Sequence, residues 1–247
     1  MSIRSQAEWC AMREVGRIVR LVLDALEQHA YAGVSTGELD RIAAAILRAH
    51  GARSAPALVY NFPGTVLISV NDEVVHGVPG ARRLAAGDVV KLDVTAEKDG
   101  YMADAARTVV LAGAETRAQR LRECAEAAFG KALAVARVGN KVSEVGRAIE
   151  REVRRRGFSV IPHLGGHGIG RTIHEAPSVP NYYNSRQTDV LTDGLVVAIE
   201  PIVTSGSSRV VEDGDGWTIR TRDGSLAAHY EHTVVVTRDA PVLLTAA

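Results

Sequence analysis

Apolar residues recur at intervals of three and four positions in four segments of the chain, which is the spacing of one face of an α-helix. These segments are residues 5–30, 35–51, 115–137 and 143–157. The first two begin with a serine that a glutamate follows three positions later (Ser5 and Glu8, Ser35 and Glu38). This pairing is the capping box that starts many helices. The pattern therefore predicts four helices in two consecutive pairs.

Each helix pair is followed by short apolar runs that predict strands. Three runs follow the first pair, at residues 65–70, 88–97 and 101–111, and four follow the second, at residues 158–161, 195–203, 217–221 and 233–237. The chain thus reads helix, helix, strands, and then the same again. We expect one α+β domain of two pseudo-symmetric halves, about residues 1–112 and 113–247, packed around one sheet.

Composition narrows the class of protein. The chain has 247 residues, of which 46% are hydrophobic and 23% charged, with no net charge, as in ordinary globular proteins. Balanced charge argues against nucleic acid or a membrane surface as the main partner. The two cysteines, Cys10 and Cys124, form no zinc or disulfide pattern. Neither a signal peptide nor a membrane span is recognisable, so we expect a cytoplasmic protein.

Two aspartates on neighbouring strands are the first candidate chemistry. With a two-residue turn at Asp99 and Gly100, Asp93 faces Ala106 and Asp104 faces Thr95. Both carboxylates then emerge on one face of the hairpin, one diagonal apart, and a turn shifted by one would make them direct neighbours. Such a pair repels unless it is protonated or bound to a cation. The pair alone leaves two interpretations open, a metal site and a solvent-exposed strand face.

Three further residues favour the metal site. His167 lies in a glycine-rich segment, Glu200 interrupts an apolar run, and Glu231 lies beside another apolar run. Individually, His167 is better explained as a core histidine, and Glu231 fits a surface position as well as a site. Together with the two aspartates they form an oxygen-rich set that suits two adjacent divalent ions.

The order of these five residues resembles that of the type I methionine aminopeptidases, and the resemblance extends over essentially the whole chain. Its most specific segments are the aspartate hairpin and residues 69–79, 166–177, 198–201 and 229–233. The resemblance implies the pita-bread fold, a curved and mostly antiparallel sheet covered by two helix pairs. It also implies hydrolysis of the first peptide bond to release the initiator methionine.

Carried over to this sequence, the resemblance implies a ligand set for two divalent ions of Co, Mn, Fe or Zn. Asp93 is expected to chelate one ion, and His167 and Glu200 the other. Asp104 and Glu231 are expected to bridge both. Glu200 is also expected to receive a proton from the attacking water and to pass it to the leaving amine.

Two more histidines have expected roles in the reaction. His174 resembles the residue that stabilises the scissile carbonyl oxygen as it becomes an oxyanion. His76 resembles the residue that contacts the peptide nitrogen of the substrate. From the residues alone, packing or a surface location would be the preferred explanation of either one.

An apolar pocket for the methionine side chain is expected from five residues: Ala57, Tyr60, Phe62, Ile173 and Trp217. Aromatic edges suit the polarizable thioether. Two of the five depart from the family pattern. Ala57 stands where relatives often carry cysteine, in an alignment that needs a one-residue gap, and Ile173 stands where an aromatic residue is common.

The expected substrates are the N-termini of nascent polypeptides with a small second residue. Four arginines at one helix end (Arg151, Arg154, Arg155 and Arg156) are best explained as a solvated face, with a transient ribosome contact as the alternative. We expect a monomer with no specific nucleic acid and no membrane partner. Two other functions compete with the first: an Xaa-Pro aminopeptidase of the same fold, and a non-catalytic binding protein on that scaffold.

Overall fold

The computed structural model describes residues 1–246 of the chain. Its helices are α1 (Gln6–His29), α2 (Thr36–Ala49), α3 (Ala55–Tyr60), α4 (Thr116–Val135) and α5 (Val142–Arg155). The four long helices begin and end within two residues of the limits expected from the apolar spacing, so that prediction is confirmed. The short helix α3 was not expected, because six residues are too few to show a helical period.

The strands are short except for one hairpin. They are β1 (Arg53–Ser54), β2 (Leu67–Val70), β3 (Glu73–Val75), β4 (Val89–Lys98), β5 (Tyr101–Val110), β6 (Ser159–Val160), β7 (Gly165–Gly168), β8 (Glu175–Pro180), β9 (Val196–Ile199), β10 (Ile202–Thr204), β11 (Val210–Glu212), β12 (Ile219–Thr221), β13 (Ala227–His229), β14 (His232–Val235) and β15 (Val242–Leu243). They form four antiparallel sheets, in the orders β1-β4-β2 with β5 beside β4, β13-β10-β6, β11-β12-β3, and β15-β14-β9-β7-β8. The single sheet expected from the sequence is therefore divided. One division falls at Pro201, which has no N–H for a ladder and separates β9 from β10.

Serine caps start the first two helices, as expected, but the predicted capping box is complete only at Ser35. The Ser35 side chain accepts the N–H of Glu38, and the Glu38 carboxylate accepts the N–H of Ser35, which completes the capping box. At the first helix, Ser5 accepts the N–H of Glu8, while the Glu8 carboxylate accepts the N–H of Arg4. Both serines therefore satisfy backbone donors that the first helical turn leaves without a helical partner.

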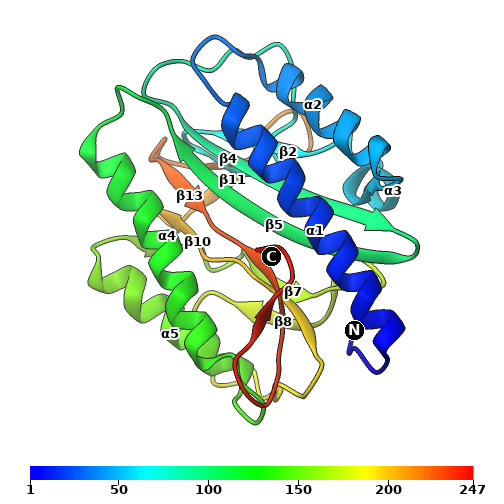
Figure 1. Ribbon diagram of the computed structural model, residues 1–247. Coiled ribbons are helices and arrows are strands. Elements are labelled where there is room, and N and C mark those ends of the chain that lie inside the picture. The colour runs from blue at the N-terminus through cyan, green and yellow to red at the C-terminus, as the bar shows by residue number, and fades with distance from the viewer. Residues whose placement is uncertain (247) are drawn as a thin grey trace.

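The helices cover one face of the strands (Figure 1). Helix α1 lies across the β4–β5 hairpin, and α4 contacts β10 and β13 on the other half of the molecule. Alternate residues of β4 (Val90, Leu92, Val94 and Ala96) belong to the apolar core beneath α1 and α2. Because strand side chains alternate, Lys91, Asp93 and Thr95 point to the opposite face. The polar face of this hairpin is therefore the one that the helices leave uncovered.

The apolar core consists of two main clusters. One lies under α1 and α2, and the other under α4 and α5. The first also contains Ile169, Ile173, Val196 and Val235 from the second half of the sequence. Burying each such side chain contributes about 1.5–3 kcal/mol. The single-domain organisation with halves of about 1–112 and 113–247 stays a prediction, which this shared core supports.

Among the helices described in residues 1–246, none combines the length and apolarity that a bilayer crossing requires.

The arginines at the end of α5 pair with acidic residues of the same helix. Arg155 and Arg156 both donate to the Glu152 carboxylate, at 2.6 and 2.7 Å, and Arg154 pairs with Glu150 at 2.7 Å. The Glu152 side chain is only 5% exposed. Hydrogen bonds from Arg155, opposed by burial and reinforced by Arg156, hold the pKa of the Glu152 carboxyl at about 2.

Replacing Glu152 by glutamine should therefore destabilise the fold. We expect the free energy of unfolding at pH 7 to fall by about 1–3 kcal/mol, because a carboxyl with a lowered folded-state pKa stabilises the protein above its unfolded pKa. The wild type loses this contribution as the pH falls from 4.5 toward 2. The free energies of unfolding of wild type and Glu152→Gln should therefore become similar in that range. Urea unfolding at several pH values measures both effects. Glu144→Gln, which removes an exposed pair with Arg147, is the control and should cost less than about 0.5 kcal/mol. Equal stability of wild type and Glu152→Gln at pH 7 would contradict this assignment.

Candidate metal centre and active site

The β4–β5 hairpin has the register that a two-residue turn requires. Asp99 and Gly100 both have positive φ, at 52° and 82°, as a type I′ turn demands. Asp93 lies opposite Ala106, and Asp104 opposite Thr95. The two carboxylates are therefore diagonal neighbours on one face, as predicted, and the alternative with a shifted turn is wrong.

The second half of the chain brings Glu231 to this hairpin. Ala106 and Glu231 exchange backbone hydrogen bonds in both directions, at 3.3 and 2.9 Å. The Thr233 hydroxyl accepts the N–H of Asp104 and donates to its carbonyl, both at 2.8 Å. These bonds join β5 to β14 and to Glu231 just before it, and so they place Glu231 beside the two aspartates.

Close backbone packing positions His167 and Glu200. His167 lies in β7, opposite Ala198 of β9, and Glu200 follows β9 directly. A Cβ atom at Gly166 would come within 2.2 Å of the Ala198 carbonyl oxygen. Glycine is therefore needed for the two strands to approach. The result is a separation of 3.5 Å between His167 Nε2 and Glu200 Oε1.

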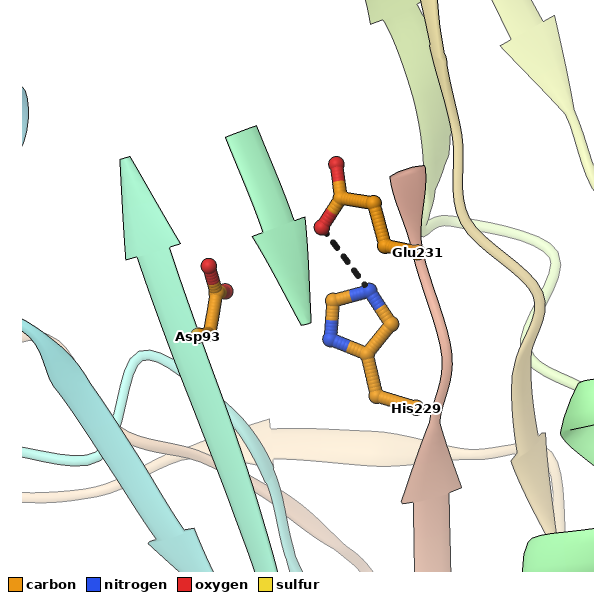
Figure 2. A group of neighbouring side chains, drawn as sticks. All are labelled: Asp93, His229 and Glu231. Atoms are coloured by element: carbon orange, nitrogen blue, oxygen red, sulfur yellow. Dashed lines mark ion pairs between the residues drawn. The ribbon is translucent and has the colours of Figure 1, made fainter. Parts of the chain in front are cut away.

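Two groups of possible ligand atoms meet at Glu231. One consists of Asp104, His167 and Glu231, and the other of Asp93, His229 and Glu231, with all ligand atoms of a group within 4.8 Å of one another. Figure 2 shows the second group, in which the His229 ring lies beside Asp93 and pairs with Glu231. Glu200 links the two groups, because its two oxygens lie 3.5 Å from His167 Nε2 and 3.5 Å from His229 Nε2. The five predicted residues therefore converge.

Unpaired polar atoms are concentrated at this point. Eight buried side-chain nitrogen or oxygen atoms lack a hydrogen-bond partner among the described residues, and five of them belong to this cluster. They are Asp93 Oδ1, Asp104 Oδ1, Glu231 Oε1, and both ring nitrogens of His229. Unpaired buried polar atoms are costly, and a bound cation removes that cost.

The charges of the cluster also favour a bound cation. Burial and the neighbouring carboxylates of Asp104 and Glu231 raise the pKa of Asp93 well above its usual range. Burial and the neighbouring carboxylates of Asp104 and Glu200 raise the pKa of Glu231 well above its usual range. Glu200 differs: burial raises its pKa, but contacts with His229 and His167 outweigh burial and lower it. Buried carboxylates with imidazole nitrogens beside them fit divalent metal ions.

His174 lies next to this cluster and contacts a pocket residue. Its Nδ1 is 2.6 Å from the hydroxyl oxygen of Tyr60, and its ring centroid is 4.3 Å from that of His167 in an edge-to-face arrangement. Burial and the neighbouring His167 imidazole lower the pKa of His174. His76 follows β3 in the left-handed conformation, with φ of 60°. Burial lowers its pKa as well. Both rings are therefore neutral at pH 7, and both line the same cavity as the acidic cluster.

This cavity has a volume of about 280 Å³. Of the expected pocket residues, Tyr60, Phe62, Ile173 and Trp217 line it. The rings of Phe62 and Trp217 meet edge to face, with centroids 5.2 Å apart. Sequence reasoning missed His163, Leu164, Leu67, Val75 and Ile202, which also line the cavity. The cavity is thus apolar at one side and acidic at the other.

Ala57 is not among the residues that line this cavity, whereas its neighbour Pro56 is, and so the role of Ala57 stays a prediction. The reason is the unexpected helix α3. Pro56 and Tyr60 are four residues apart and so lie on one face of that helix, whereas Ala57 is turned about 100° away. A second omission is His229, to which neither the sequence pattern nor the resemblance assigns a role. The sequence does contain a pattern that predicts its place in the site. His229 and Glu231 are two residues apart, and side chains two apart on an extended segment share a face.

Fold and cluster together define a metallopeptidase. The family model of metallopeptidase family M24 matches residues 10–238, and the chain belongs to this family. Divalent metal binding follows from that membership. The chain is 44% identical over 247 residues to methionine aminopeptidase 2 of Bacillus subtilis, covering 99% of each chain. It is 40% identical over 254 residues to the methionine aminopeptidase of Aquifex aeolicus, covering 99% of this chain and 98% of that one.

Solved structures agree with this family. The methionine aminopeptidase of Thermotoga maritima superimposes with a TM-score of 0.96 at 33% identity, covering 99% of each chain. Prolidase from Pyrococcus furiosus superimposes with a TM-score of 0.80 at 22% identity, covering 99% of this chain but 65% of that one. The expected α+β pita-bread fold is therefore confirmed.

Proposed function

We propose that this protein is a methionine aminopeptidase that uses two divalent metal ions. It hydrolyses the first peptide bond of a polypeptide and releases the N-terminal methionine. The observation that carries the proposal is the convergence of Asp93, Asp104, His167, Glu200 and Glu231 at the acidic side of an apolar cavity. The similarity to proteins named methionine aminopeptidases supports the same activity.

Two ions are proposed because the ligand atoms form two groups that share one carboxylate. Asp93 would hold one ion, and His167 and Glu200 the other. Glu231, which both groups share, would contact both ions, and the resemblance implies the same role for Asp104, which lies in the His167 group. When bound, such ions polarise the scissile carbonyl and lower the pKa of water to about 7. The donor set is compatible with Co, Mn, Fe or Zn.

Glu200 is proposed to transfer the proton. Burial raises its pKa, but the contacts with His229 and His167 together outweigh burial and lower the pKa. It is therefore a carboxylate at pH 7 and can accept the proton of the attacking water. The same group then donates that proton to the leaving amine, which completes general acid and base catalysis with one side chain.

The neutral histidines are proposed to act on the substrate. The Tyr60 hydroxyl can donate to His174 Nδ1, and the remaining ring proton of His174 is then on Nε2. That N–H can donate to the carbonyl oxygen as negative charge develops on it. His76, also neutral and lining the cavity, is proposed to contact the peptide nitrogen. Neither role requires a change in charge at neutral pH.

The apolar part of the cavity is proposed to hold the methionine side chain. Tyr60, Phe62, Ile173 and Trp217 line it, and aromatic edges make favourable contacts with a thioether sulfur.

Four further expectations stay predictions. They are the preference for nascent chains with a small second residue, a transient ribosome contact, a monomeric state and a cytoplasmic location. Because Arg155 and Arg156 pair with Glu152, these two arginines are less available to bind the phosphates of ribosomal RNA.

Peptide specificity distinguishes this proposal from the two competing functions. We expect the metal-loaded protein to release methionine from Met-Gly-Met and to leave Ala-Pro peptides essentially uncleaved, as measured by chromatography of the products. Leu-Gly-Met is the matched control for the pocket and should be cleaved more slowly. Faster cleavage of Ala-Pro peptides would assign the Xaa-Pro activity instead. Metal binding without cleavage of any peptide would assign a binding protein.

A further inference from the structure

His229 lies inside the acidic cluster, and its backbone is fixed. It is the last residue of β13, two residues before Glu231, and only 1% of it is exposed. The Thr108 hydroxyl accepts the N–H of His229 at 2.9 Å and donates to its carbonyl at 2.8 Å. The ring is thus held among the carboxylates by a strand that has little freedom to move away.

The ring nitrogens of His229 have neighbours but no hydrogen bonds. Nε2 lies 3.3 Å from Glu231 Oε2 and 3.5 Å from Glu200 Oε2. Both nitrogens nevertheless lack a hydrogen-bond partner among the described residues. Figure 2 shows Nε2 directed at Glu231 and the other nitrogen on the side of Asp93. A protonated ring would form ion pairs with Glu231 and Glu200 at these distances. A neutral ring would leave two buried nitrogens without a hydrogen bond, which is costly unless something else binds it.

The surroundings of His229 match those of His167. His167 Nε2 is 3.5 Å from one oxygen of Glu200, and His229 Nε2 is 3.5 Å from the other. Each histidine forms a group with Glu231 and one aspartate, Asp104 in one case and Asp93 in the other. Separations slightly above 3 Å suit two atoms that bind one ion from adjacent directions, since each metal–ligand bond is about 2.0–2.2 Å.

We propose that His229 is a sixth ligand of the metal centre and binds the ion held by Asp93 and Glu231. The inference rests on the proposed two-metal function and adds to it, because the resemblance assigns His229 no role. Each ion would then have one imidazole ligand. A nitrogen ligand to the ion beside Asp93 favours Co, Fe or Zn over Mg and Ca, because Mg and Ca prefer oxygen ligands.

Calorimetric titration with Co²⁺ tests the proposal on protein freed of metal by chelation. For the wild type we expect two binding events. His229→Gln should weaken one of them by about 10- to 100-fold and leave the other unchanged. His167→Gln should weaken the other event.

His232→Gln is the matched control, because His232 is also a buried neighbour of Glu231. Its ring nitrogens lie 2.8 Å from the Thr245 hydroxyl and 3.2 Å from the Tyr230 hydroxyl. It should leave both affinities unchanged.

A crystal structure of the Co²⁺-loaded wild type decides between binding and mere proximity. We expect a His229 nitrogen about 2.1 Å from the ion beside Asp93. Unchanged affinities in His229→Gln, or a ring more than about 3 Å from both ions, would overturn the proposal and leave His229 at most a positioning residue. Neither outcome affects the proposed function. A wild type that binds no ion would overturn the proposed function itself.

Discussion

Replacing Glu231 by glutamine is expected to abolish methionine release from Met-Gly-Met, with kcat lower by about 10³-fold or more. Glu231 is the residue shared by both groups of ligand atoms, so its loss affects both proposed ions. Two-metal sites supply several kcal/mol of transition-state stabilisation, and about 4 kcal/mol corresponds to 10³-fold in rate. Steady-state kinetics with excess Co²⁺, together with the metal content of the purified variant, measure the effect.

The same substitution should not destabilise the metal-free protein. Burial and the carboxylates of Asp104 and Glu200 raise the pKa of Glu231 well above its usual 4.5. A carboxyl with a raised folded-state pKa contributes stability below its unfolded pKa, and this contribution is lost as the pH rises through the folded pKa. Metal-free wild type should therefore lose stability as the pH rises above 4.5, and Glu231→Gln should lose less.

Glu212→Gln, at an exposed position of β11, is the control for the Glu231 variant. It should change neither the activity nor the pH dependence of stability. Retention of more than a tenth of the wild-type kcat by Glu231→Gln would contradict the proposed bridging role. A loss of activity explained by unfolding alone would show as a lower melting temperature in the metal-free variant, which is not expected.

Replacing His174 by alanine should lower kcat by about 10²- to 10³-fold while the protein keeps its bound metal. This range is the usual cost of losing one hydrogen-bond donor to a developing oxyanion. His174 belongs to neither group of ligand atoms, although its ring lies 4.3 Å from that of His167. Kinetics and metal analysis of one preparation separate the two effects.

Tyr60→Phe provides the matched comparison for the His174 prediction. It removes the hydroxyl 2.6 Å from His174 Nδ1 but keeps the aromatic ring in the pocket. We expect a smaller loss in kcat, about tenfold, with little change in KM, because the histidine remains but its tautomer is no longer fixed. Loss of metal from His174→Ala, or a change confined to KM, would contradict the role in stabilising the oxyanion.

Elements with a long or repeated pattern could be predicted from the sequence. The four long helices each contain several turns of apolar spacing, and the β4–β5 hairpin combines ten-residue strands with a turn dipeptide of strong preference. That register alone placed Asp93 and Asp104 on a shared face. The position of Glu231 beside them depends on hydrogen bonds between segments more than 120 residues apart, which no local pattern contains.

Short or glycine-rich elements could not be predicted. Strand β7 has the sequence Gly-Gly-His-Gly, which lacks strand-forming side chains, and its conformation is set by packing against β8 and β9. Helix α3 has only six residues, and it places Pro56 rather than Ala57 in the wall of the cavity. One division of the expected single sheet falls at Glu200 and Pro201, which interrupt the apolar run at 195–203 between β9 and β10. Because apolar residues continue on both sides of these two positions, the sequence analysis treats the run as one strand.

Stepwise return of metal to the chelated protein tests the central claim most directly. Metal-free protein is mixed with Met-Gly-Met, Co²⁺ is added in increments, and released methionine is measured. We predict no release without metal, a rise that saturates at no more than two ions per chain, and no rise in Glu231→Gln. Methionine release by protein shown to be metal-free, or equal restoration of Glu231→Gln, would contradict the assignment of this cluster as the metal centre.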